Sequence, residues 1–120
     1  MKRNELGKVG EEKAVIYLQK KGFKILHRNW RHKAWEIDII ALEKETLVIV
    51  EVKSRTHDYI DDPVNAVTGK KQRFLLNAAD AFIRENDIDR KIRFDVVAVI
   101  FYPEKIEIEH IDNAFYPTLR

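Results

Sequence analysis

The chain has 120 residues, of which 45% are hydrophobic and 35% are charged, and its formal net charge is +2. This composition suits one folded domain over residues 1–120 and excludes a disordered chain. The absence of cysteine excludes disulfides, zinc–thiolate sites and thiol catalysis. No apolar run approaches the roughly twenty residues that span a membrane, and residues 1–5 begin no signal peptide, so we expect a cytoplasmic protein that contacts no membrane.

Hydrophobic periodicity predicts a helix over residues 6–21, which Gly22 ends, and then strands over 23–31, 35–42 and 47–53. The short polar connection 43–46 predicts that the last two strands form an antiparallel hairpin. A polar loop is expected over 54–62, and Pro63 suits the start of a second helix over 64–86, with Gly69 as a point of interruption. Strands over 92–102 and 106–110 follow, and residues 111–120 form an irregular tail.

The resulting order, αβββαββ, predicts an α/β (α+β) fold with a mixed central sheet flanked by helices. Because successive side chains of a strand point to opposite faces, Leu47, Ile49, Glu51 and Lys53 share one face of the third strand. A charged pair therefore ends an otherwise apolar face.

The second strand has the same character. Asp38 shares a face with Ile40 and Leu42, and the opposite face carries Ile37, Ile39 and Ala41. If the turn centres on residues 44–45, Leu42 lies opposite Leu47 and Ile40 lies opposite Ile49. This register also places Asp38 opposite Glu51 and Glu36 opposite Lys53, with opposed Cβ atoms about 4.5–5.5 Å apart.

Two neighbouring carboxylates destabilise a sheet unless a cation compensates them. Hard cations such as Mg²⁺ bind one or two carboxylates, with water and phosphate completing the shell. Asp38 and Glu51 fit this role, the backbone carbonyl of Val52 can add a ligand, and Lys53 can position water or neutralise phosphate. The alternative is an ordinary ion-pair cluster around Lys53, in which Glu36 takes part.

The arrangement of an Asp followed by Glu-x-Lys resembles the core motif of the restriction-endonuclease-like nuclease superfamily. The chain more closely resembles the YraN-like family of uncharacterised bacterial proteins, which is similar to archaeal Holliday junction resolvases. The matching segments run in order along nearly the whole chain: Gly10-Glu11 with Ala14 and Leu18, Gly22-Phe23, Asn29-Trp30-Arg31, residues 36–41, residues 50–55, residues 70–73, residues 93–96 and residues 110–115.

The resemblance implies a restriction-endonuclease-like fold and an endonuclease that uses Mg²⁺ or Mn²⁺ to hydrolyse DNA, including branched or structured DNA. Asp38 and Glu51 would be the metal ligands, Lys53 the catalytic lysine, and Glu11 an additional acidic residue that reaches the metal or its water shell. A homodimer is consistent with resolvase-like enzymes, which cut two strands symmetrically.

The expected partner is DNA, with RNA as an alternative, because basic clusters hold phosphates. One departure from the family concerns Trp35, which occupies the place of a usual glycine and would narrow access to the site, change the strand entry or stack on a base. The residues expected to contact nucleic acid are Arg31, Trp35, Arg55, Lys70, Lys71 and Arg73.

Other interpretations stay open at this point. The protein can be a nucleic-acid-binding module on a nuclease fold that does not cut. Asp95 lies in an apolar strand, where a buried hydrogen-bonding role is favoured over a role in the site. Residues 69–71 lack the Ser or Thr and the spacing of a nucleotide-triphosphate loop, which excludes that site.

Overall fold

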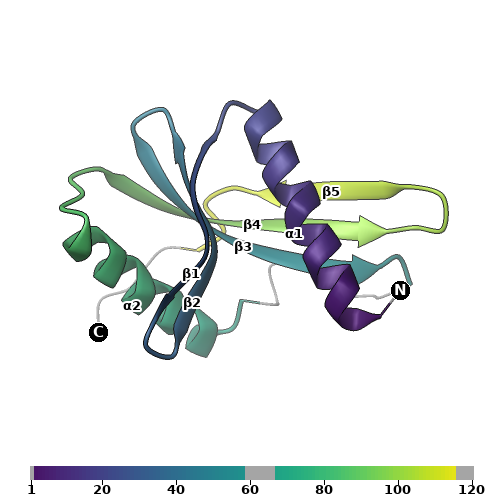
Figure 1. Cartoon of the computed structure of the whole chain (residues 1–120), viewed down its shortest axis with the longest axis horizontal. Helices are drawn as coiled ribbons and strands as arrows, with labels where there is room; N and C mark the ends of the chain where they lie inside the picture. Colours follow the sequence, from purple (N-terminus) through teal and green to yellow (C-terminus); the bar gives the residue numbers. More distant parts are fainter. Residues whose placement is uncertain (1, 59–66, 116–120) are drawn as a thin grey trace.

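A computed structural model describes residues 2–58 and 67–115 and has the predicted element order (Figure 1). The elements are α1 (Arg3–Lys20), β1 (Lys24–His32), β2 (Trp35–Glu43), β3 (Thr46–Thr56), α2 (Gly69–Glu85), β4 (Lys91–Phe101) and β5 (Ile106–Ile111). The five strands form one mixed sheet in the order β1-β2-β3-β4-β5, in which only β3 and β4 are parallel. Within the described ranges, neither helix is long and apolar enough to cross a membrane.

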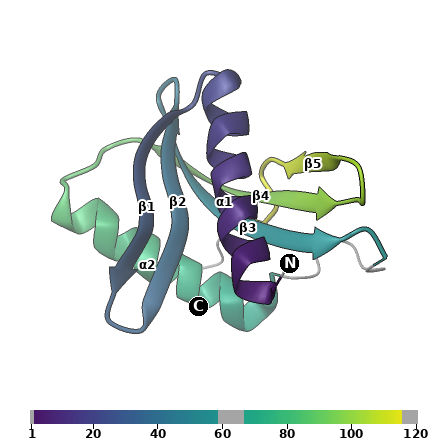
Figure 2. The same cartoon turned by 45° about the vertical axis from the view of Figure 1, so that its right-hand side comes forward.

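The sheet has a hydrophobic core on each face, because each helix covers a different side (Figure 2). The face under α1 buries Ala14 and Leu18 against Val48 and Val50. The face under α2 buries a second set of residues, which includes Leu47, Ile49, Leu75, Ala79 and Phe82. Burial on both faces explains why β3 is an almost continuous apolar run before Glu51.

The predicted hairpin register is confirmed over its apolar part, where Ile40 pairs with Ile49 and Leu42 pairs with Leu47. The ladder ends at the pair Ile39–Val50, and beyond it β2 bends away from β3 together with β1 (Figure 1). Asp38 and Glu51 therefore lie where the two strands separate, rather than as a directly opposed pair.

The same bend corrects the predicted alternation of β2. Ile37 packs in the core under α2, whereas Ile39 packs in the core under α1, although both were expected on one face. The change of face falls opposite Asn29 of β1, which adopts a left-handed φ of 52° between the pairs Arg28–Ile39 and Trp30–Ile37. A φ in this region departs from the extended conformation of a regular strand.

Several element boundaries differ from the predictions, including that of α1, which begins at Arg3 rather than at residue 6. Strand β3 continues to Thr56 because residues 53–56 pair with residues 98–101 of β4, so the expected loop starts later. Helix α2 begins at Gly69 because the Thr68 hydroxyl caps it by accepting a hydrogen bond from Lys71 N at 3.2 Å. The expected helical residues 64–66 lie outside the described residues. Strand β5 includes Ile111, which was assigned to the tail, and residues 116–120 also lie outside the described residues.

Helix α1 approaches β3 closely at Gly10. A Cβ atom at this position would lie 2.9 Å from Ser54 Cβ and closer still to Ser54 Oγ. Real Cβ atoms do not approach so closely, so only glycine lets the helix lie at this depth. Since Glu11 is the next residue, the contact also fixes where Glu11 stands above the sheet.

Replacing Gly10 with alanine is expected to lower the free energy of unfolding by about 1–3 kcal/mol, because the helix must move away from β3. The matched control is Gly7→Ala, in the same helix, where nothing lies within 4 Å of the new Cβ. That substitution is expected to stabilise the protein by up to about 1 kcal/mol. Urea denaturation of both variants measures the difference, and equal effects would contradict the close approach.

Candidate metal centre

Two carboxylates meet where β2 and β3 separate. Asp38 is half-buried, and its Oδ2 accepts a hydrogen bond from Val52 N at 2.8 Å. Glu51 is only 6% exposed. Burial, and then the negative charge of Glu51, raise the pKa of Asp38 to about 7, and a protonated Asp38 lies close enough to hydrogen-bond to Glu51. The strand separation therefore concentrates negative charge in a poorly hydrated place.

The Glu51 carboxylate is only partly neutralised. Its Oε2 lies 3.3 Å from Lys71 Nζ, which reaches it from the first turn of α2. Its Oε1 is buried and has no hydrogen-bond partner among the described residues. A buried acceptor of this kind costs about 1–3 kcal/mol, and an unpaired ionised one costs more. The sequence predicted that Lys71 contacts nucleic acid, but it did not predict that Lys71 contacts Glu51.

The donors at this point suit a hard divalent cation. The described residues contain no group of three or more His, Cys, Asp or Glu side chains able to hold a metal ion. A cation here would have two carboxylates, those of Asp38 and Glu51, with the Val52 carbonyl as a further oxygen. Mg²⁺ typically binds through one or two carboxylates and keeps several waters, so this small donor set fits it.

A hollow of about 1330 Å³ opens beside Asp38, between the first half of α1 and strands β1, β2 and β3. Asp38, Val52 and Lys53 all line it. We call it the cationic hollow, because its lining has six basic residues against four acidic ones. The basic residues are Arg3, Lys8, Arg28, Arg31, Lys53 and Arg55, and the acidic residues are Glu11, Glu12, Glu36 and Asp38.

Glu11 lines the cationic hollow, and residues of β1 bind its carboxylate. Asn29 Nδ2 donates a hydrogen bond of 2.7 Å to Glu11 Oε1, and Arg28 Nη2 lies 3.6 Å from the same oxygen. Burial raises the pKa of Glu11, and the hydrogen bond from Asn29 offsets part of this rise. Glu11 thus faces the hollow without joining Asp38 and Glu51 in one cluster. Sequence reasoning did not place Arg28 or Asn29 among the site residues, because neither contact with Glu11 follows from a local pattern.

Trp35 does not line the cationic hollow. Its ring stacks on His32, with centroids 5.9 Å apart, and packs against the core under α2. The expectation that Trp35 narrows access to the site is therefore wrong for the hollow, because the ring lies on the other face of the sheet. Glu36 does not take Lys53 as its partner and instead forms a 2.8 Å ion pair with Arg31.

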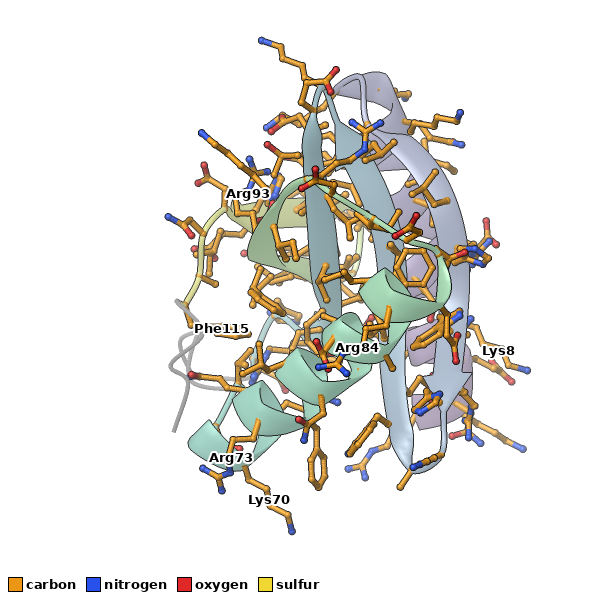
Figure 3. The ribbon with its side chains drawn as sticks, turned by 90° about the vertical axis from the view of Figure 1, so that its left-hand side faces the viewer. Lys8, Lys70, Arg73, Arg84, Arg93 and Phe115 are labelled. Carbon is orange, nitrogen blue, oxygen red and sulfur yellow. The ribbon has the colours of Figure 1, made fainter. Side chains whose placement is uncertain are left out.

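The remaining basic residues divide between two places. Arg31 and Arg55 line the cationic hollow, whereas Lys70 and Arg73 are exposed at the start of α2 and point away from the sheet (Figure 3). Lys71 lies between these two in sequence and turns toward Glu51. The basic cluster of residues 70–73 thus has one inward and two outward side chains.

Asp95 belongs to a separate buried network, as the favoured interpretation held. Its oxygens accept from Arg93 at 2.8 and 2.9 Å and from Asn113 N at 3.0 Å, and lie 2.8 Å from His110 Nε2. Burial alone would raise the pKa of Asp95, but the hydrogen bonds from His110, Arg93 and the Asn113 backbone outweigh it and hold this pKa below its usual range. None of these residues lines the cationic hollow.

The raised pKa of Asp38 predicts that the protein without metal loses stability as the pH rises. The folded state keeps a proton up to pH about 7, whereas the unfolded chain releases it near 3.8. The stabilisation that the protonated Asp38 gives the folded state is therefore fully present below about pH 4. It is lost as the pH rises toward 7, at no more than about 1.4 kcal/mol of unfolding free energy per pH unit.

Urea denaturation in EDTA between about pH 5 and pH 8 measures this loss, with Asp38→Asn as the control that cannot titrate. The wild type should lose stability relative to Asp38→Asn across this range. Parallel profiles would show that Asp38 titrates normally.

Fold and site together define a single-domain α+β protein with a half-buried and a buried carboxylate at a strand separation, beside a cationic hollow. The chain belongs to the uncharacterised protein family UPF0102, the YraN-like family, whose profile matches residues 10–99. It is 42% identical to a UPF0102 protein of Parabacteroides distasonis over 99% of this chain and 98% of the relative. It is 46% identical to one of Bacteroides thetaiotaomicron (97% and 96%) and 44% identical to one of Flavobacterium psychrophilum (94% and 95%).

Proposed function

We propose that this protein is a divalent-metal-dependent endonuclease that hydrolyses phosphodiester bonds of DNA. The observation that carries the proposal is the pairing of half-buried Asp38 with buried Glu51, where one Glu51 oxygen has no partner among the described residues and Asp38 lines a cationic hollow. Folded proteins seldom keep such a pair without a compensating cation.

The side chains have distinct roles in this proposal. Asp38 and Glu51, with the Val52 carbonyl, hold Mg²⁺ or Mn²⁺, which when bound lowers the pKa of a water and neutralises charge on the phosphate. Lys53 follows two residues after Glu51 and lines the hollow with Asp38, so its ammonium group orients the attacking water or stabilises charge on the phosphate. Glu11, fixed by Asn29, lines the same hollow.

The cationic hollow supplies the binding surface for the DNA backbone. Lys8, Arg28 and Arg55 come from three different elements, so their charges surround the space rather than follow one edge. Contacts to phosphate fix the position of a nucleic acid without reading its sequence, and they weaken as salt rises. The proposal therefore favours recognition of shape, such as branched or structured DNA, over recognition of sequence.

Cleavage of labelled duplex, single-stranded and four-way-junction DNA tests the proposal. Each substrate is incubated with wild type, Glu51→Gln and the control Asp80→Asn, in Mg²⁺, Mn²⁺ or EDTA. Asp80 is an exposed acid on α2 that pairs with Arg84, so its replacement removes a charge outside the site. We expect cutting that needs metal, persists in Asp80→Asn and is lost in Glu51→Gln.

A second candidate function is a nucleic-acid-binding module that does not cut. The ion pair between Lys71 and Glu51 favours it, because it shows that the chain can neutralise part of the site by itself. DNA binding that is unchanged by EDTA and by Glu51→Gln, without cutting in any metal, would support this candidate and reject the nuclease.

A further inference from the structure

The backbone of Lys71 is anchored in the first turn of α2, while its side chain extends from that turn. The helix cap fixes its backbone, since Lys71 N donates to Thr68 Oγ1 at 3.2 Å. The next residue, Gln72, donates from Nε2 to the Val67 carbonyl at 3.1 Å and fastens the same turn to the buried Val67. The long side chain of Lys71 then reaches Glu51. The Lys71 side chain is 38% exposed, whereas the Glu51 side chain is 7% exposed.

Glu51 would face two cations if a divalent ion entered the site. Lys71 Nζ lies 3.3 Å from Glu51 Oε2, and the ion would bind the same carboxylate. Two positive charges on one buried carboxylate repel each other strongly, because little water screens them. Lys71 can leave with little change elsewhere, since its side chain is flexible and more than a third exposed.

We propose that Lys71 is a built-in counter-ion, which pairs with Glu51 in the absence of metal and is displaced when a divalent cation binds. This inference rests on the proposed metal centre and adds a competitor for it. The displaced ammonium group joins the outward-facing Lys70 and Arg73 at the start of α2 (Figure 3).

Metal and phosphate binding are then coupled. A cation at Glu51 releases Lys71 for an anionic group, and a phosphate that holds Lys71 frees Glu51 for the cation. Such coupling acts equally in both directions. The exchange also explains how a site with two buried carboxylates stays folded before it acquires metal.

Isothermal titration calorimetry of the whole chain with MnCl₂ and MgCl₂, at a pH of about 8 where carboxylates are ionised, tests the exchange. Lys71→Gln should bind the metal about threefold to tenfold more tightly than wild type, because the competing cation is gone. Lys71→Arg keeps the charge and should bind like wild type. Lys70→Gln, at the neighbouring exposed position, is the matched control and should also leave the affinity unchanged.

Thermal unfolding in EDTA supplies a readout that needs no metal. Lys71→Gln should melt at a lower temperature than wild type, and Lys70→Gln should not. If wild type binds metal but Lys71→Gln binds it equally or more weakly, the counter-ion proposal fails and the metal centre stands. If wild type binds neither metal, both proposals fail together.

Discussion

Replacing Lys53 with alanine is expected to slow DNA cleavage by about a hundredfold to a thousandfold while metal and DNA remain bound. Lys53 lines the cationic hollow beside Asp38 but is not one of the proposed metal ligands. Its charge acts mainly where negative charge develops as the bond breaks, so its loss affects the rate more than the affinity.

Single-turnover cleavage and a binding titration, performed on the same DNA, separate these effects. Lys91→Ala is the control, because Lys91 is exposed on β4 and does not line the cationic hollow. A Lys53→Ala variant that cuts at the wild-type rate would show that this lysine has no part in the reaction. Equal losses of rate and DNA affinity would assign it to DNA binding alone.

Replacing Asp95 with alanine is expected to lower the free energy of unfolding by about 3–5 kcal/mol. The carboxylate is 1% exposed and accepts hydrogen bonds from Arg93 and the Asn113 backbone, besides its contact with His110. Alanine removes the buried acceptor that these groups share, although Arg93 keeps Glu43 at 2.7 Å and His110 Nδ1 keeps Tyr17 Oη at 3.3 Å.

Urea denaturation measures this loss, and Asp80→Ala is the matched control. The Asp80–Arg84 pair lies on the exposed face of α2, and such pairs contribute about 0.3–0.5 kcal/mol. A loss below about 1 kcal/mol for Asp95→Ala would mean that water replaces the carboxylate readily, contrary to its burial.

The hairpin at the centre of the site could be predicted because its information is local. Four polar residues separate two apolar strands, and the apolar pairs Ile40–Ile49 and Leu42–Leu47 allow one register. That register brought Asp38 near Glu51. It did not predict that the ladder ends at Ile39, close to which Asn29 of β1 adopts a left-handed conformation that no periodicity specifies.

The contacts of Lys71 and Glu11 could not be predicted from pattern alone. Lys71 reaches Glu51 only because α2 begins at Gly69 and packs across β2, the neighbour of β3, which no periodicity specifies. Glu11 meets Asn29 because Gly10 lets α1 approach β3 closely. The glycine at position 10, inside a predicted helix, was the sequence signal for that approach.

Both the endonuclease and the Lys71 counter-ion depend on a divalent cation binding between Asp38 and Glu51. Crystals of the protein grown or soaked in MnCl₂, and measured at a wavelength where manganese scatters anomalously, show directly where the ion binds. We expect an anomalous peak within bonding distance of both carboxylates and of the Val52 carbonyl, absent in Glu51→Gln. A wild-type crystal with no peak there, and with Lys71 still paired to Glu51, would contradict the metal centre and the nuclease mechanism built on it.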